Sequence, residues 1–156
     1  AGMDLLNGVE LHRLSTAIQE ALQNALYRGN LELTYDQWRA EEDFDESGIA
    51  VSPIVAQRLA QEPYKDRKIK YDVLINKDFI RVIITDQGPG FDITNLPIKG
   101  DPHAMVDSNG RGLVLIQSLT DDVKFNPAGN QITLLKRCKI IKPVVDSEAT
   151  SDATMA

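Results

Sequence analysis

The spacing of apolar side chains along the chain predicts three helices. The longest spans residues 9–28, where apolar residues recur every three or four positions and so line one face of a helix. Gly29 and Asn30 follow it, and both residue types tolerate the left-handed backbone angles at which helices often end. Two shorter helices are expected, over residues 53–62 and over residues 112–120. The core-facing residues expected on the first two helices are Leu14, Ile18, Ala21, Leu22, Ala25, Ile54, Val55 and Leu59.

Elsewhere the apolar and polar residues alternate strictly, which is typical of strands with one buried face. Residues 69–75 and 79–85 are joined by a turn-forming Asn-Lys-Asp and should pair as an antiparallel hairpin. Residues 123–125 and 131–138 give two further strands. With the helices on one face, these strands predict an α+β fold, a two-layer α/β sandwich with a mainly antiparallel sheet. The residues of the first strand expected to be buried are Ile69, Tyr71, Val73 and Ile75.

Composition and charge exclude several classes of function. The 156 residues suffice for one domain with a single core. No apolar run approaches the ~20 residues that span a bilayer, and no signal segment opens the chain, so we expect a cytoplasmic protein without membrane contact. The formal net charge of -6 argues against direct nucleic-acid binding. The single cysteine, Cys138, cannot form an internal disulfide and is expected in the core.

The first candidate site consists of Glu20 and Asn24, which lie four residues apart on the first predicted helix. At this spacing the carboxylate and the carboxamide point the same way. An amide oxygen can hold a hard cation, while the carboxylate orients or deprotonates a nucleophile. Two such residues by themselves are more simply interpreted as a solvated surface pair, so the hypothesis depends on the motifs that follow.

The second candidate site follows the predicted strand 79–85. Asp86 places a carboxylate at the strand end, and Gly88 and Gly90 let the backbone come close to a ligand. A carboxylate accepts hydrogen bonds, so Asp86 can select a ligand that presents an amine, such as the exocyclic amino group of adenine.

The third candidate site opens the helix predicted over residues 112–120. Gly110 and Gly112 leave backbone N–H groups exposed at the helix start, which is a ready site for phosphates. Arg111, between them, can neutralise charge on a terminal phosphate. The irregular loop of residues 91–109 is expected to act as a lid over a triphosphate. No Walker-type Gly-x4-Gly-Lys-Ser/Thr motif occurs in the chain.

The order and spacing of these three motifs resemble a known superfamily. Glu20-x3-Asn24, Asp86-x-Gly88-x-Gly90 and Gly110-x-Gly112 resemble the N, G1 and G2 boxes of the GHKL (histidine kinase-like) ATP-binding superfamily, which includes gyrase, histidine kinases and MutL. Within it, the chain is most similar to the bacterial anti-sigma-factor serine/threonine kinases. The resemblance spans roughly residues 9–138 and implies the Bergerat-type ATP-binding fold.

The resemblance also implies roles for individual residues. Glu20 matches the general base that acts on the acceptor hydroxyl, and Asn24 matches the ligand of the Mg²⁺ that bridges the phosphates of ATP. Asp86 matches the residue that reads adenine, and Thr133 matches a threonine that supports the same base. Arg28 departs from the pattern, because many relatives carry histidine there. The expected ATP-binding residues are Asn24, Asp86, Gly88, Gly90, Gly110, Arg111, Gly112, Leu113 and Thr133.

Two functions from different classes remain open. The first is an ATP-dependent protein kinase of the anti-sigma type, which phosphorylates Ser or Thr of an antagonist protein and also sequesters a sigma factor. The second is a non-catalytic or weakly hydrolytic ATP-binding module of a multidomain bacterial signalling regulator. The intact Glu20 favours the kinase. The catalytic half of a histidine kinase is disfavoured, because no dimerising helical pair with a phosphoacceptor histidine is recognisable.

The resemblance further implies that the protein forms homodimers, as relatives often do. We expect the chain to divide into a cloning-derived lead-in (residues 1–8), an ATP-binding domain (residues 9–142) and a disordered tail or linker (residues 143–156). Whether the chain is a whole protein or a domain excised from a larger one stays open.

Overall fold

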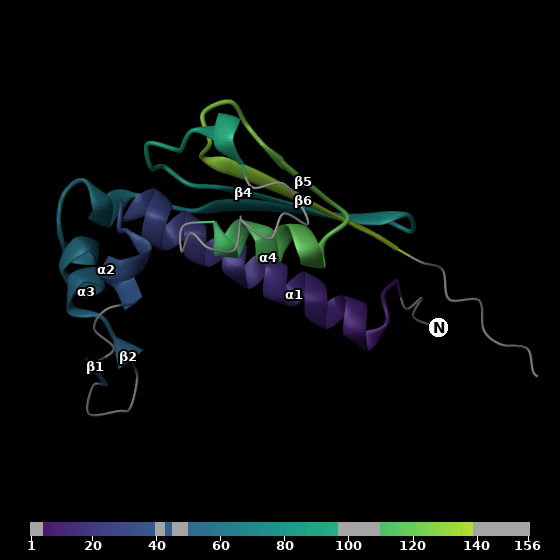
Figure 1. Ribbon diagram of the computed structural model, residues 1–156, viewed down its shortest axis with the longest axis horizontal. Coiled ribbons are helices and arrows are strands. Elements are labelled where there is room, and N and C mark those ends of the chain that lie inside the picture. Colours follow the sequence, from purple (N-terminus) through teal and green to yellow (C-terminus); the bar gives the residue numbers. More distant parts are fainter. Residues whose placement is uncertain (1–4, 40–42, 45–49, 97–109, 139–156) are drawn as a thin grey trace, which may run out of the picture.

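The computed structural model describes residues 5–39, 43–44, 50–96 and 110–138 (Figure 1). Its centre is a four-stranded antiparallel sheet in the order β3-β4-β6-β5. The strands are β3 (Lys70–Ile75), β4 (Phe79–Thr85), β5 (Asp122–Phe125) and β6 (Gln131–Arg137). Helices α1 (Gly8–Gln23) and α4 (Arg111–Leu119) lie side by side on one face of this sheet (Figure 1). The predicted α+β class, with two layers, is confirmed.

The hydrophobic core lies between the helices and the sheet. The predicted apolar face of α1 is confirmed, since its members are buried (Leu14, Ala21 and Ala25) or partly buried (Ile18 and Leu22). In β4 and β6 every second residue is buried, as the pleat of a strand requires. The register sets Val82 opposite Leu134 and Ile84 opposite Ile132, so all four side chains enter the same core.

The same alternation buries one charged residue of β6, Lys136. Its ammonium group forms ion pairs with Glu10, in the first turn of α1, and with Asp121, which precedes β5. A buried ammonium group is costly unless it is paired. The pairs therefore fix the start of α1 over the sheet, where Asn7 caps the helix by accepting a hydrogen bond from the Glu10 backbone N–H at 2.8 Å.

The C-terminal end of α1 differs from the sequence prediction. The α-helix ends at Gln23 and continues as a π-helix, η1 (Asn24–Asn30), so the helical run does end at Asn30. Neither Gly29 nor Asn30 is left-handed, however, and the left-handed residue that follows is Glu32, with φ 52°. A π-helical turn is a wider, rarer conformation that is frequent at functional sites. The predicted reason for Gly29 was therefore wrong, and its actual role depends on its neighbour Asp86, described below.

The described parts of residues 31–66 include helices next to the C-terminal end of α1 (Figure 1). Their elements are α2 (Tyr35–Arg39), the two-stranded antiparallel pair β1 (Asp43–Phe44) and β2 (Ala50–Val51), α3 (Pro53–Ala60) and the 3-10 helix η2 (Tyr64–Asp66). The ring of Trp38 stacks on that of Tyr27 at 4.6 Å and so joins α2 to η1. Helix α3 has no buried residue, which contradicts the expectation that Ile54, Val55 and Leu59 face the core.

The predicted burial of one face of β3 is also wrong. Tyr71, Val73 and Ile75 pair with core residues of β4 and therefore point to the helical side of the sheet. They are nevertheless 70%, 47% and 59% exposed, because β3 is an edge strand and α1 and α4 pack on the other strands. The alternation correctly identified residues that share a face, but not what covers that face. None of the described helices is both long enough and apolar enough to cross a membrane.

Two neighbours on α4 test the position of the core. Ile116 is fully buried, whereas Leu115 is 40% exposed. We expect Ile116→Ala to lower the free energy of unfolding by about 2–5 kcal/mol, because a cavity adds to the lost burial, and the matched Leu115→Ala to lower it by less than about 1 kcal/mol. Urea unfolding measures both values, and equal losses would contradict the described packing of α4.

Candidate functional site

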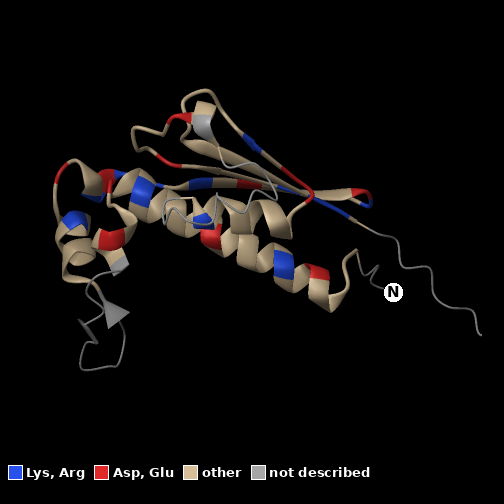
Figure 2. Cartoon of the chain, viewed as in Figure 1, with Lys and Arg blue, Asp and Glu red and all other residues tan. Residues whose placement is uncertain are grey.

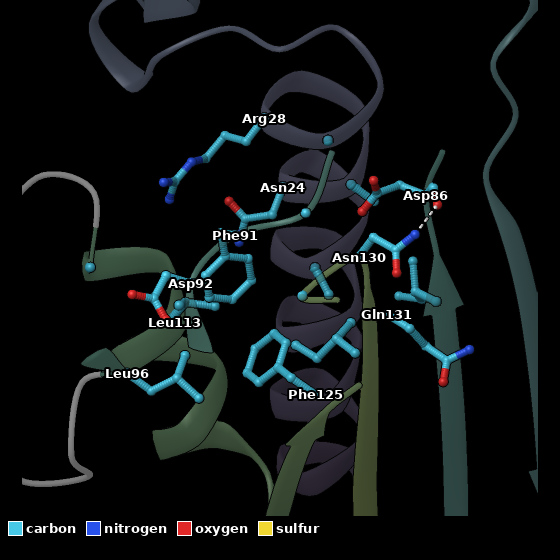
Figure 3. A pocket seen from close by; sticks show the side chains of 18 residues that line it. Asn24, Arg28, Asp86, Phe91, Asp92, Leu96, Leu113, Phe125, Asn130 and Gln131 are labelled. Carbon is cyan, nitrogen blue, oxygen red and sulfur yellow. Dashed lines mark hydrogen bonds between the residues drawn. The ribbon is translucent and has the colours of Figure 1, made fainter. Parts of the chain in front are cut away.

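A pocket of about 310 Å³ lies where the end of α1, the loop after β4, the turn between β5 and β6 and the start of α4 meet (Figure 3). This volume is at the lower end of the usual range for small-molecule sites, which begins at about 300 Å³. The polar residues that line it include Asn24, Arg28, Asp86, Asp92, Asn130 and Gln131. Figure 2 shows basic and acidic residues interspersed along the helices and the sheet. The charged residues that line the pocket, Arg28, Asp86 and Asp92, therefore set its local charge.

Asp86 is held at the end of β4 by the turn between β5 and β6. Its backbone N–H donates to the carbonyl oxygen of Asn130 at 3.0 Å, and its own carbonyl oxygen accepts from Asn130 Nδ2 at 3.2 Å. One carboxylate oxygen, Oδ1, accepts from the Gly88 N–H at 2.8 Å. Burial raises the pKa of Asp86 above its usual value, while the Gly88 bond and the positive charge of Arg67 act in the opposite direction. The structure thus places a half-buried carboxyl at the pocket wall.

Gly29 lies directly against this carboxyl group. A Cβ atom at position 29 would overlap the Asp86 carboxyl, and a Cβ atom at Gly88 would overlap the backbone of Gly29. Gly90, with φ 75°, comes equally close to the carbonyl oxygen of Ala128. Gly88 and Gly90 therefore allow the protein's own backbone segments to meet. Gly90 also lines the pocket, where the sequence predicted a close approach to a ligand, whereas Gly88 does not.

Glu20 and Asn24 meet the third motif at Gly112. A Cβ atom at position 112 would overlap the Glu20 carboxylate and lie 3.2 Å from Asn24 Nδ2, so α1 and α4 touch at this point. Asn24 lines the pocket, and its Nδ2 is buried without a hydrogen-bond partner among the described residues. An unpaired buried donor costs about 1–3 kcal/mol, and a ligand that brings an acceptor oxygen would satisfy it. Glu20 is next to the pocket but does not line it.

The predicted phosphate motif is only partly at the pocket. Gly110, the N-cap of α4, and Leu113 line it, whereas the exposed Arg111 does not. Most of the predicted lid, residues 97–109, lies outside the described residues. Among the described residues that line the pocket, the one cation is Arg28, to which the sequence analysis gave no ligand contact. Its position four residues after Asn24, on the same helix face, was the available signal.

The opposite wall is apolar and aromatic. The rings of Phe91 and Phe125 meet edge to face at 5.2 Å, and Ile132 completes this wall. Thr133 is not among the lining residues; Gln131, two positions nearer the turn, takes its place and donates through Nε2 to Thr85 Oγ1 at 2.9 Å. Phe91, Phe125 and Gln131 are pocket residues that the sequence motifs did not identify, because Phe91 and Phe125 meet only in the folded chain and Gln131 reaches the pocket from the start of β6.

Comparisons with known proteins agree with this geometry. The family described as "Histidine kinase-like ATPase domain" matches residues 4–136. The serine-protein kinase RsbW of Bacillus cereus strain ATCC 10987 is 28% identical over 94 residues, which is 55% of this chain and 58% of that protein. RsbW proteins of B. cereus strain AH187 and of B. thuringiensis subsp. konkukian strain 97-27 give the same values. The chain thus spans less than two thirds of the length of these relatives. Since the family match covers the sheet, α1, α4 and all three motifs, the chain belongs to the histidine kinase-like ATPase domain family.

Proposed function

We propose that the pocket binds ATP with Mg²⁺ and that the protein is a regulatory kinase of the anti-sigma-factor type. The observation that carries this proposal is that Asn24, Asp86 and Gly110, one from each motif, line the same pocket. These residues are far apart in the sequence, so their meeting supports a common ligand. Membership of an ATPase family and the similarity to serine-protein kinases support ATP as that ligand.

The adenine ring of ATP would occupy the end of the pocket near Asp86. The carboxylate can accept a hydrogen bond from the exocyclic amino group, and Phe91 and Phe125 offer an apolar wall for the ring. Gln131 lies at the same end and adds an amide group beside the base. GTP presents a carbonyl oxygen in place of the amino group, so an ionised Asp86 would repel it.

The phosphates would lie at the end formed by Asn24, Arg28 and Gly110. The unpaired side-chain amide nitrogen of Asn24 can donate to a phosphate oxygen, and the side-chain carbonyl oxygen of Asn24 can hold Mg²⁺. Bound Mg²⁺ would neutralise phosphate charge, as it does in other phosphoryl-transfer enzymes. The N-terminus of α4 at Gly110 and the guanidinium group of Arg28 supply positive charge to the same end.

Glu20 would act as the general base. It lies one turn before Asn24 on α1 and beside Gly112, outside the pocket wall, which leaves room for an acceptor hydroxyl to approach. As the new oxygen–phosphorus bond forms, Glu20 takes the hydroxyl proton, the bond between the β- and γ-phosphates breaks, and ADP leaves.

The protein partners follow from the same similarity. We propose an anti-sigma antagonist-like protein as the acceptor of the phosphate, a sigma factor as a second partner, and a homodimer as the assembly. Three exposed apolar residues of β3 that share the helical face of the sheet, Tyr71, Val73 and Ile75, provide a surface for such contacts. A non-catalytic ATP-binding module of a larger signalling protein is the alternative, because the residues that line the pocket would suffice for ATP binding without Glu20.

The kinase proposal predicts a separation of binding from transfer. We expect Glu20→Ala to slow phosphate transfer from ATP to the cognate antagonist protein by about 10²–10⁴-fold, because the general base is lost, while ATP affinity changes by less than about two-fold. Gln19→Ala, at the exposed neighbouring position, serves as the control. Radiolabelled transfer and calorimetry measure the two quantities. An unchanged transfer rate would remove the base assignment, and no transfer by the unmodified protein would favour the binding module.

The adenine assignment predicts opposite effects of one substitution on binding and stability. Asp86→Asn should reduce the preference for ATP over GTP by about ten-fold or more, because a charged hydrogen bond is lost. Because burial raises the pKa of Asp86 in the folded state, its carboxylate opposes folding as pH rises through that pKa. The neutral Asn should therefore raise the urea midpoint of the ATP-free protein at about pH 7.

Asp92→Asn is the matched control for this experiment. Asp92 also lines the pocket, but hydrogen bonds from Thr94 lower its pKa, so its carboxylate favours folding above its unfolded-state pKa. We expect Asp92→Asn to leave the ATP preference unchanged and to lower the urea midpoint. Equal nucleotide selectivity of all three proteins would refute Asp86 as the adenine reader.

A further inference from the structure

We propose that Arg67 is a positioning residue for nucleotide recognition, which holds Asp86 in place through a ring of hydrogen bonds behind the pocket and sets a positive charge near its carboxyl group. This inference rests on the proposed role of Asp86 in reading adenine. Arg67 does not line the pocket and belongs to none of the three motifs.

The first contacts tie Arg67 to the end of the π-helix. Arg67 follows η2 and directly precedes the segment that leads into β3. Its Nη1 donates to the backbone carbonyl oxygen of Asn30 at 2.9 Å and to Glu32 Oε1 at 2.6 Å. Its guanidinium carbon lies 5.1 Å from the centre of the Tyr64 ring. The side chain is only 19% exposed, so these contacts fix it in one orientation.

The next contacts tie Asn30 to the residue after Asp86. Asn30 is 2% exposed, and its Oδ1 accepts the backbone N–H of Gln87 at 2.7 Å. Gln87 Oε1 in turn accepts the backbone N–H of Lys68 at 2.7 Å. Since Lys68 is bonded to Arg67, the three hydrogen bonds close a ring that holds Gln87 from both its backbone and its side chain. The ring thus restrains Asp86 through its neighbour Gln87, in addition to the hydrogen bond that Asp86 accepts from Asn130.

Arg67 also acts on Asp86 through its charge. Among the described residues, the charged groups around this carboxyl are Arg67, its ion-pair partner Glu32, and the pocket residues Arg28 and Asp92. The other contacts of the Asp86 carboxyl, Gly29 and Gly88, are uncharged. Burial raises the pKa of Asp86, and the positive charge of Arg67 lowers it. An ionised carboxylate accepts a hydrogen bond from the amino group more strongly than a protonated carboxyl group does, so Arg67 would extend adenine recognition to lower pH.

The test compares three variants with the unmodified protein. Arg67→Ala removes the positive charge and opens the hydrogen-bond ring. Arg67→Lys keeps the charge but lacks the planar guanidinium group, and Arg58→Ala is the control. Arg58 lies over the same Tyr64 ring, at 4.4 Å, but takes no part in the hydrogen-bond ring. The affinity for ATP is measured by calorimetry from about pH 5 to about pH 8, and the Asp86 carboxyl carbon is titrated by NMR in the ATP-free protein.

We expect Arg67→Ala to move the NMR midpoint of Asp86, and the acidic limb of ATP affinity, upward by about half a pH unit or more. Arg67→Lys should restore most of this shift, because the charge is kept, and Arg58→Ala should not move the midpoint. An Asp86 midpoint that Arg67→Ala leaves unmoved would overturn the proposal, even if the affinity falls by the same factor at every pH. Failure of the unmodified protein to bind ATP would instead count against the proposed function, and the NMR midpoint would still decide whether Arg67 acts on Asp86.

Discussion

The structure depends on the close contact between η1, which continues α1, and the end of β4, where Gly29 lies against the carboxyl group of Asp86. No side chain larger than hydrogen fits at position 29 without moving that carboxyl. The contact brings helix and sheet together at the one place where residues of all three motifs can surround a single pocket. The π-helical turn from Asn24 to Asn30 sets the backbone at this contact and carries Asn24 and Arg28 to the pocket wall.

This arrangement leaves two polar groups of the pocket in environments that lower the free energy of unfolding when no ATP is bound. Asp86 is half buried with a raised pKa, and the amide nitrogen of Asn24 is buried without a partner. Both features lower the stability of the empty protein, and both would be relieved by a ligand that offers an amino group at one end and acceptor oxygens at the other. The hydrogen-bond ring through Arg67 and Asn30 supports Asp86 against this cost.

The sequence predicted the elements with strong periodicity and the residues that alternate within them. Strand β4 has the predicted bounds, since it is rich in β-branched residues and a turn-forming segment precedes it. The exposure of Tyr71 could not be predicted, because a period of two shows which residues share a face but not whether a helix covers it. The sequence pointed to Thr133, whereas Gln131 lines the pocket. A strand pattern does not show which of its residues lies close enough to the turn between β5 and β6 to reach the pocket. The bonds of Arg67 link residues distant in sequence and leave no local pattern.

A calorimetric titration of the protein with ATP, in the presence and absence of magnesium and with GTP for comparison, tests whether the pocket is a nucleotide site. We expect saturable binding that prefers ATP and strengthens with magnesium, and we expect Asn24→Ala to remove the effect of magnesium. No binding at millimolar ATP, or equal affinity for ATP and GTP with and without magnesium, would contradict this expectation.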